Sequence, residues 1–245
     1  MSNWEKELAP YIEELEKLFS AVKVDLELPP EIPELPTSEP LPATAPIAYR
    51  AYSFYRTGCV IRARELLESI LTLSKKGLIP SVAPLVRLAY EIWGVSHILT
   101  AALQDIHRFL SEPITKNLAP QLEGKLRKVD RVFEGVRTPV LLPWGTSAAE
   151  TPIHILDAIR GLSDLTHTSL EDYEFLCEAA HPNFPRYMEW YIAGKIGDNW
   201  SNKVAAERCG SLIERTISLL KQSINGIKTE SELGVKVCIE LFQIK

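Results

Sequence analysis

One segment, from Pro84 to about Leu110, constrains the fold of this chain more than any other. Its apolar residues point in nearly every direction around a helix: Leu85, Val86, Leu88, Ala89, Tyr90, Ile92, Trp93, Val95, Ile98 and Leu99. A helix that is apolar all round is buried on most sides. Arg87, Glu91 and His97 interrupt the run, and such residues are costly in lipid, so we expect no membrane span here. The segment predicts the central helix of a soluble bundle.

Helical periodicity continues along the rest of the chain, and no strand pattern of comparable length is present. Further helices are expected at Ala48–Lys76, at Gln121–Val136, up to about Asp164, from Thr168 to Pro182, at Asn202–Ile224 and from Glu232 onward, the last capped by Thr229. Only 12 glycines occur among 245 residues, which suits long helices. We therefore predict an all-α fold, an up-and-down multi-helix bundle.

The N-terminal part differs from the rest in composition. An apolar stripe at three- and four-residue steps predicts an amphipathic helix at residues 1–23: Trp4, Leu8, Tyr11, Ile12, Leu15, Leu18, Phe19 and Val22. Residues 24–46 are rich in proline, which favours extended polyproline geometry and a reach of roughly 70 Å. The bundle domain then spans residues 47–245. The helix is expected to dock on its own domain, on a second copy or on another protein, and its sequence does not choose among these.

Charge and cysteine content limit the compartment and the partners. The net charge is -5, so no overall field attracts nucleic acid, and the run Lys125 to Arg131 is interpreted as a solvated helix face. The four cysteines are far apart and form no Cys-x-x-Cys pair, which indicates free thiols in a reducing compartment. Residues 1–6 contain no apolar run of a secretory signal. We expect a cytoplasmic protein.

Two charged residues stand out on the predicted central helix. Arg87 and Glu91 are one turn apart and share a face, and Gly94 follows one turn later. An unpaired charge on a buried helix costs several kcal/mol, so these residues need partners. Two interpretations remain open: an internal ion pair that ties helices together, or a functional site beside Gly94, which lets a helix or a ligand approach.

A second candidate lies where a later helix ends. Tyr173, Cys177 and His181 share one face at four-residue steps, and Glu178 is one turn from His181. Pro182 ends the helix after His181, where the carbonyl groups stabilise an imidazolium and raise its pKa. His181 is then either a general acid or phosphate-binding cation, or a residue that caps the helix.

The pattern Glu178-x-x-His181 is also half of a di-iron bundle motif. Such a site needs a second Glu-x-x-His, and the sequence contains none. We therefore expect no metal and no cofactor.

The run Ala83-Pro-Leu-Val-Arg87-Leu-Ala-Tyr-Glu91, preceded by a long helix with a lysine-and-glycine turn and followed later by the Tyr173–His181 helix end, resembles HEPN-like helical families of prokaryotes. The resemblance covers roughly Ala48 to Tyr191. It implies a compact helical bundle that acts as a homodimer, often as a metal-independent endoribonuclease of toxin-antitoxin and antiviral systems. The composite site of that family is lined by an arginine and a histidine that are separated by four to six intervening residues.

One pair in this chain has that spacing, Arg160 and His167, although Gly161 stands where the family often has a polar residue. If the family chemistry applies, the histidine transfers the proton of a ribose 2′-hydroxyl and the arginine holds the scissile phosphate. The pair is either Arg160 with His167 or Arg87 with His181, and we favour Arg87, Glu91 and His181 because burial makes their polarity harder to explain structurally.

The functional hypothesis is therefore a HEPN-like effector that acts on RNA or nucleotides in a defence or toxin system. The alternative is a non-catalytic interaction protein that engages a protein partner through its N-terminal helix.

Overall fold

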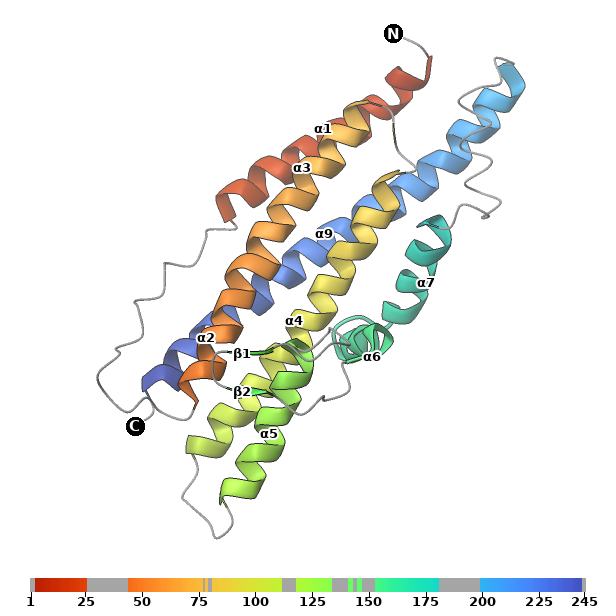
Figure 1. The fold of residues 1–245 in the computed structure, drawn as a ribbon. Helices are drawn as coiled ribbons and strands as arrows, with labels where there is room; N and C mark the ends of the chain where they lie inside the picture. Colours follow the sequence, from red (N-terminus) through yellow and green to blue (C-terminus); the bar gives the residue numbers. More distant parts are fainter. Residues whose placement is uncertain are drawn as a thin grey trace.

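The computed structural model describes residues 3–25, 44–76, 78, 81–111, 118–133, 141–142, 145–146, 153–180 and 199–243. Its elements are α1 (Asn3–Asp25), α2 (Ala45–Ser53), the π-helix η1 (Phe54–Ile61), α3 (Arg62–Lys75), α4 (Val82–Ser111), α5 (Leu118–Phe133), β1 (Leu141–Leu142), β2 (Gly145–Thr146), α6 (Ile155–Gly161), the 3-10 turn η3 (Leu162–Asp164), α7 (Ser169–Ala180) and α9 (Asn199–Gln243). The fold is an all-α multi-helix bundle, as predicted (Figure 1). The two-residue strands β1 and β2 pair antiparallel in a segment expected to be a loop.

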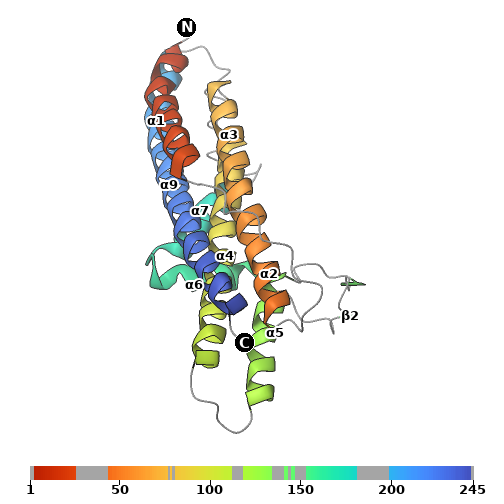
Figure 2. The same ribbon diagram turned by 90° about the vertical axis from the view of Figure 1, so that its left-hand side faces the viewer.

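Helix α4 is the centre of the bundle, as its apolar pattern predicts. It packs against α9 along one side and contacts α3, α5, α6 and α7 on others (Figures 1 and 2). Buried residues occur all along the helix: Val86, Ala89, Tyr90, Trp93, Leu99, Leu103 and Ile106. Within the described part of the chain, no helix is long and apolar enough to cross a membrane.

The expected helix from Ala48 to Lys76 is continuous in the structure but not uniform. Helix α2 leads directly into η1, whose wider turns run for eight residues before α3 begins. Tyr55 and Cys59 of η1 are buried, and the Tyr55 hydroxyl lies 2.8 Å from Oγ1 of Thr100 on α4. The π-helical stretch therefore brings a phenol into the polar centre of the bundle.

The predicted division of the C-terminal part into two helices is wrong. Helix α9 runs for 45 residues without a break, so Thr229 lies inside it and caps nothing. Gly226 and Gly234, which favour a break in an isolated helix, lie beneath the rings of Trp93 and Tyr55. The rings pack where the glycines have no side chains, and this contact stabilises the helix through the region.

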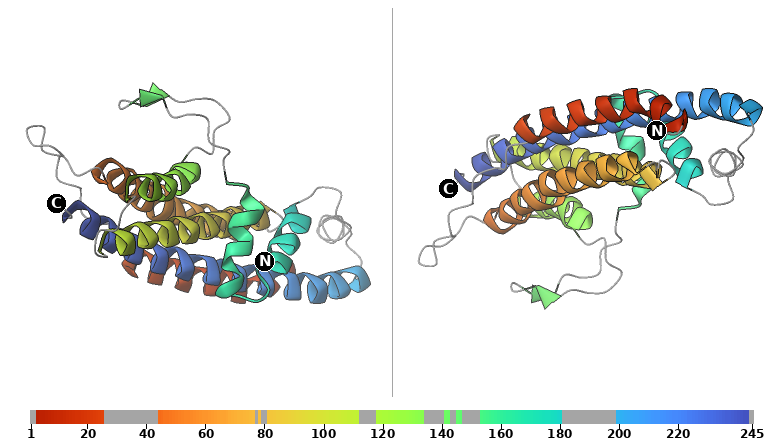
Figure 3. Two further views of the ribbon diagram at one scale, coloured as in Figure 1. Left: turned by 90° about the horizontal axis from the view of Figure 1, so that it is seen from below. Right: turned by 90° about the horizontal axis from the view of Figure 1, so that it is seen from above.

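Helix α1 docks on its own chain. It lies along α9 and beside α3 (Figures 2 and 3). Leu15 is 4% exposed, and Glu16 lies 2.6 Å from Lys75 of α3, while Lys221 of α9 contacts Glu14. In this structure the helix adopts the first of the three docking arrangements that the sequence allows. Most of the proline-rich linker, residues 26–43, lies outside the described residues.

Candidate functional site

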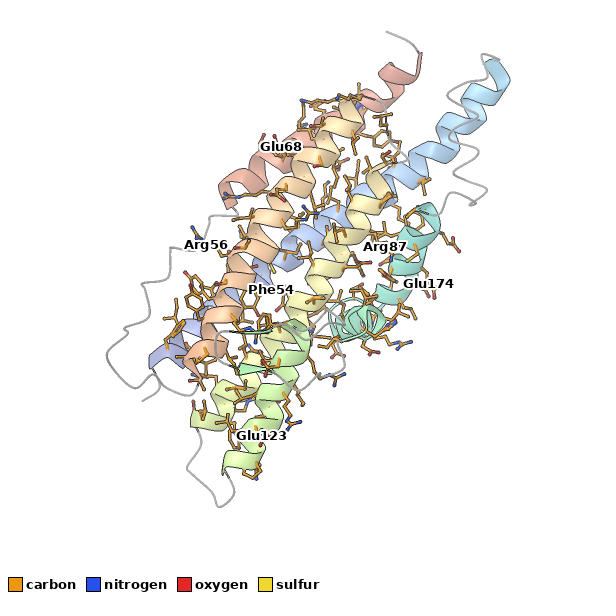
Figure 4. The ribbon with its side chains drawn as sticks, viewed as in Figure 1. Phe54, Arg56, Glu68, Arg87, Glu123 and Glu174 are labelled. Carbon is orange, nitrogen blue, oxygen red and sulfur yellow. The ribbon has the colours of Figure 1, made fainter. Side chains whose placement is uncertain are left out.

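The structure brings Arg87, Glu91 and Tyr173 into one hydrogen-bonded cluster. Arg87 on α4 donates from Nε to Oε1 of Glu91 at 2.9 Å and from a terminal nitrogen to the Tyr173 hydroxyl at 3.0 Å. The Tyr173 hydroxyl donates to the same Glu91 oxygen at 2.8 Å. Arg87 extends from α4 on the side that faces α7 (Figure 4). We call these three residues the Arg87 cluster.

Gly94 explains how α7 reaches this position. A Cβ atom at Gly94 would stand 3.1 Å from the backbone carbonyl of Ala158, so α6 crosses α4 in direct backbone contact at this point. In Figure 1, α6 is seen nearly end-on where α4 runs across the view. The chain then turns through η3 into α7, which contacts both α6 and α4. The expectation that Gly94 admits a neighbour is confirmed, and the neighbour is a helix.

The cluster is partly open to solvent. The Arg87 side chain is 36% exposed and the Glu91 side chain 22%. Both residues belong to α4, so the ion pair by itself joins no helices, and the link to α7 passes through the Tyr173 phenol. The sequence predicted that Arg87 and Glu91 would be buried. In the structure both side chains are half-buried, and both form hydrogen bonds with the Tyr173 hydroxyl.

The cluster sets the protonation of its members. Burial raises the pKa of Tyr173, and the bond to Glu91 raises it further, so the phenol keeps its proton. Burial lowers the pKa of Arg87, but the hydrogen bonds to Glu91 and Tyr173 outweigh it and the net shift is upward. The pKa of the neighbouring Cys177 thiol is also raised, mainly by burial, and Arg87 only partly opposes this. Tyr173 is a donor here, and Cys177 is not an activated nucleophile.

Helix α7 is held from its other side as well. Asp172, next to Tyr173, accepts hydrogen bonds from Thr168 at 2.6 Å and from Arg215 of α9 at 3.0 Å. The Arg215 guanidinium also stacks 4.2 Å from the Phe175 ring centre. Because adjacent residues face α4 and α9, the position of Tyr173 is fixed by two helices.

The remaining predicted site residues lie apart from this cluster or outside the described residues. Glu178 is exposed on α7, and His181 lies just beyond the last described residue of that helix. Arg160 is exposed and pairs with Asp157 of its own helix at 3.1 Å. His167 is exposed in the turn before α7, and no described contact joins it to Arg160.

A polar pair that sequence reasoning missed lies further along α4, where this helix packs against α9. His97 Nδ1 is 2.7 Å from Oε1 of Glu230 on α9. Glu230 lies at the predicted boundary between two helices, so the sequence pattern assigned it to no helix face. On one continuous helix, Gly226, Glu230 and Gly234 share a face because they are four residues apart. Two glycines on either side of a glutamate would have indicated that this face packs closely against another helix.

Within the described residues, no group of three or more histidine, cysteine, aspartate and glutamate side chains is placed to hold a metal ion. Comparison with protein-family models, with curated proteins and with solved structures finds no match to this chain. The site is therefore interpreted from its own geometry.

Replacing Tyr173 with phenylalanine tests the link between α4 and α7. The variant loses a hydrogen bond to Glu91 and one from Arg87, and we expect the free energy of unfolding in urea to fall by about 2 kcal/mol, because both bonds involve charged groups. Tyr49, which is exposed on α2, provides the matched control. The Tyr49→Phe variant should change stability by less than about 0.5 kcal/mol. Equal effects of the two variants would show that the cluster does not hold α7.

Proposed function

We propose that this protein is a HEPN-like helical effector that cleaves RNA without a metal ion, with Arg87 binding the scissile phosphate and His181 transferring protons. The observation that carries the proposal is the Arg87 cluster itself: an arginine, a carboxylate and a phenol from two helices meet at a half-buried position. In sequence, His181 follows Tyr173 and Cys177 on the same helical register. The choice of Arg87 over Arg160 rests on burial, since the Arg87 side chain is 36% exposed and the Arg160 side chain 61%.

The geometry of Arg87 supports a role in phosphate binding. Its Nε and one terminal nitrogen are used by Glu91 and Tyr173, which fix the plane of the guanidinium. Among the described residues, no contact uses the other terminal nitrogen, so its N–H groups can bind a phosphate oxygen. A fixed guanidinium loses little entropy on binding. Glu91 and Tyr173 are positioning residues in this scheme. His181 acts as general base on the ribose 2′-hydroxyl and then as general acid on the leaving oxygen.

The protein's charge is consistent with local recognition of RNA. With a net charge of -5, the chain has no overall positive field, so the cluster must attract the substrate over a short distance. The homodimeric state and the defence or toxin role belong to this proposal through the family resemblance, and the cytoplasmic location belongs to it through the cysteine content.

Cleavage of cellular RNA in the presence of a chelator tests the proposal. We expect the wild-type protein to cleave, and the His181→Ala variant to lose roughly a hundredfold or more in rate, as general acid–base catalysts do. The Arg87→Lys variant should lose rate because lysine keeps the charge but not the planar donor set. Arg62→Lys is the matched control, since Arg62 is an exposed arginine paired within its own helix.

Each result decides between the candidate sites. Loss of cleavage in His167→Ala with normal cleavage in His181→Ala would move the site to Arg160 and His167. No cleavage by the wild-type protein would contradict the enzymatic proposal.

One observation favours the second function, a non-catalytic protein that engages a partner through α1. Among the α1 side chains that the structure describes, residues 9–21, only Leu15 is buried. The remaining contact consists of the partly buried side chains of Tyr11, Leu18 and Phe19 and of ion pairs with α3 and α9. Such a helix leaves its own domain more easily than a core helix does, and the same stripe is then free for a partner.

A further inference from the structure

His97 on α4 contacts two other helices at once. Its Nδ1 atom faces the Glu230 carboxylate of α9 at 2.7 Å. The Cδ2 edge of the ring lies 3.9 Å from the point where a Cβ of Gly161 would stand, and the nearby backbone of Gly161 also raises the pKa of the ring. Gly161 is the last residue of α6. A single imidazole therefore connects α4 with the end of α6 and with the middle of α9.

Both contacts favour the charged form of the ring. The Glu230 carboxylate beside Nδ1 favours the protonated ring, and the backbone of Gly161 raises the pKa of His97 in the same direction. The charged groups that face the ring are Glu230 from α9 and Asp164 from η3, and both are acidic. The hydrogen bond with Glu230 raises the pKa of His97 above 6.5, although burial opposes this shift.

The buried Glu230 carboxylate also needs the proton on His97, because the imidazolium offsets its negative charge. Its side chain is 8% exposed, compared with 22% for His97. The carbonyl oxygen of Glu230 accepts a hydrogen bond from Thr100, but its carboxylate has His97 as the described cationic partner. A buried carboxylate whose partner becomes neutral loses much of its compensation.

We infer that His97 and Glu230 form a proton-dependent clamp that holds α6 and α9 against α4, and that residues 155–180 loosen when His97 loses its proton. These residues include η3 and α7, so the clamp connects pH to the position of Tyr173. The inference does not depend on the proposed ribonuclease activity, because it concerns the packing of helices.

Proton linkage determines whether the clamp weakens at acidic or at alkaline pH. The folded-state pKa of His97 lies above the unfolded value of about 6.5. The clamp therefore contributes its full stability below about pH 6.5 and loses it as pH rises through the folded-state pKa. Loosening of residues 155–180 is expected on the alkaline side.

Two measurements on the full chain between pH 6 and pH 9 test the clamp. The first is an NMR titration of the His97 ring in the wild-type protein, which should have a midpoint above 6.5. The second is the hydrogen-exchange protection of amides in residues 155–180, corrected for intrinsic exchange. Protection should fall through the same midpoint, by roughly tenfold for each unit by which the folded pKa exceeds the unfolded one.

The chain contains a matched control for this experiment. His107 and Glu240 form a second α4–α9 pair at 3.5 Å, with side chains 34% and 37% exposed. The His97→Gln variant should lose the pH dependence of protection, while His107→Gln should keep the wild-type profile. A His97 midpoint at or below 6.5 in the wild-type protein, or a wild-type profile in His97→Gln, would overturn the inference.

Discussion

Replacing Gly226 with alanine is expected to lower the free energy of unfolding by about 3 kcal/mol. A Cβ atom at this position would stand 2.2 Å from Nε1 and Cε2 of Trp93, far inside contact distance. Trp93 has little room to move, because it is buried and packs edge-on against Tyr90 with ring centres 5.5 Å apart. Either the indole or α9 must shift, and the shift disturbs the contact between the two longest helices. Urea unfolding measures the change.

The control variant is expected to change the free energy of unfolding in the opposite direction. Gly124 lies on α5, and a Cβ there would meet nothing within 4 Å. The Gly124→Ala variant should raise the free energy of unfolding by about 1 kcal/mol, since alanine favours helix more than glycine does. A Trp93→Leu substitution should reduce the cost of Gly226→Ala in a double-mutant cycle. If Gly226→Ala stabilised the protein as Gly124→Ala does, the close contact between Trp93 and α9 would be wrong.

Replacing Leu15 with aspartate is expected to release α1 while the rest of the bundle stays folded. The carboxylate cannot remain in the apolar contact with α3 and α9, and loss of that contact should cost about 3 kcal/mol. This corresponds to a roughly hundredfold loss of hydrogen-exchange protection for amides in residues 9–21. Amides of α4 should keep their protection, because α4 is buried by other helices.

Glu13→Gln is the control in the same helix. Glu13 pairs with Lys17 at 2.8 Å, and both side chains are well exposed at 65% and 74%. Its removal should change the protection of α1 by less than about threefold, as for other exposed pairs. A global loss of protection in Leu15→Asp would show that α1 is part of the core and would exclude release of the helix to a partner.

The helices that formed as predicted are those whose apolar pattern decides their own burial. The prediction for α4 holds almost to the residue, since few other structures can bury apolar side chains on every face. The break predicted at Thr229 is wrong because a capping pattern expresses only a local preference. This preference is smaller than the energy of packing a buried ring, so tertiary contacts override it.

In the candidate site too, contacts within one helix could be predicted from the sequence, and contacts between helices could not. That Arg87 and Glu91 share a face follows from helical geometry, and their hydrogen bond bears this out. Tyr173 was a candidate because it shares a helix face with Cys177 and His181. Its hydrogen bonds to Arg87 and Glu91 span more than 80 positions of the chain, so the sequence pattern did not predict them. The partner of His97 was missed for the same reason, because Glu230 lies 133 positions away.

The amino-acid sequence by itself determined that this chain forms long helices, that α4 is the buried one, and that Arg87 and Glu91 lie together on it. These properties depend on neighbours within one or two turns, where the period of the helix sets every distance. Only the tertiary structure decided that α9 is continuous, that α1 packs on its own chain, and that Tyr173 and Glu230 meet α4. Each of those depends on contacts between helices, where a missing side chain at Gly94 or Gly226 determines how closely two backbones approach.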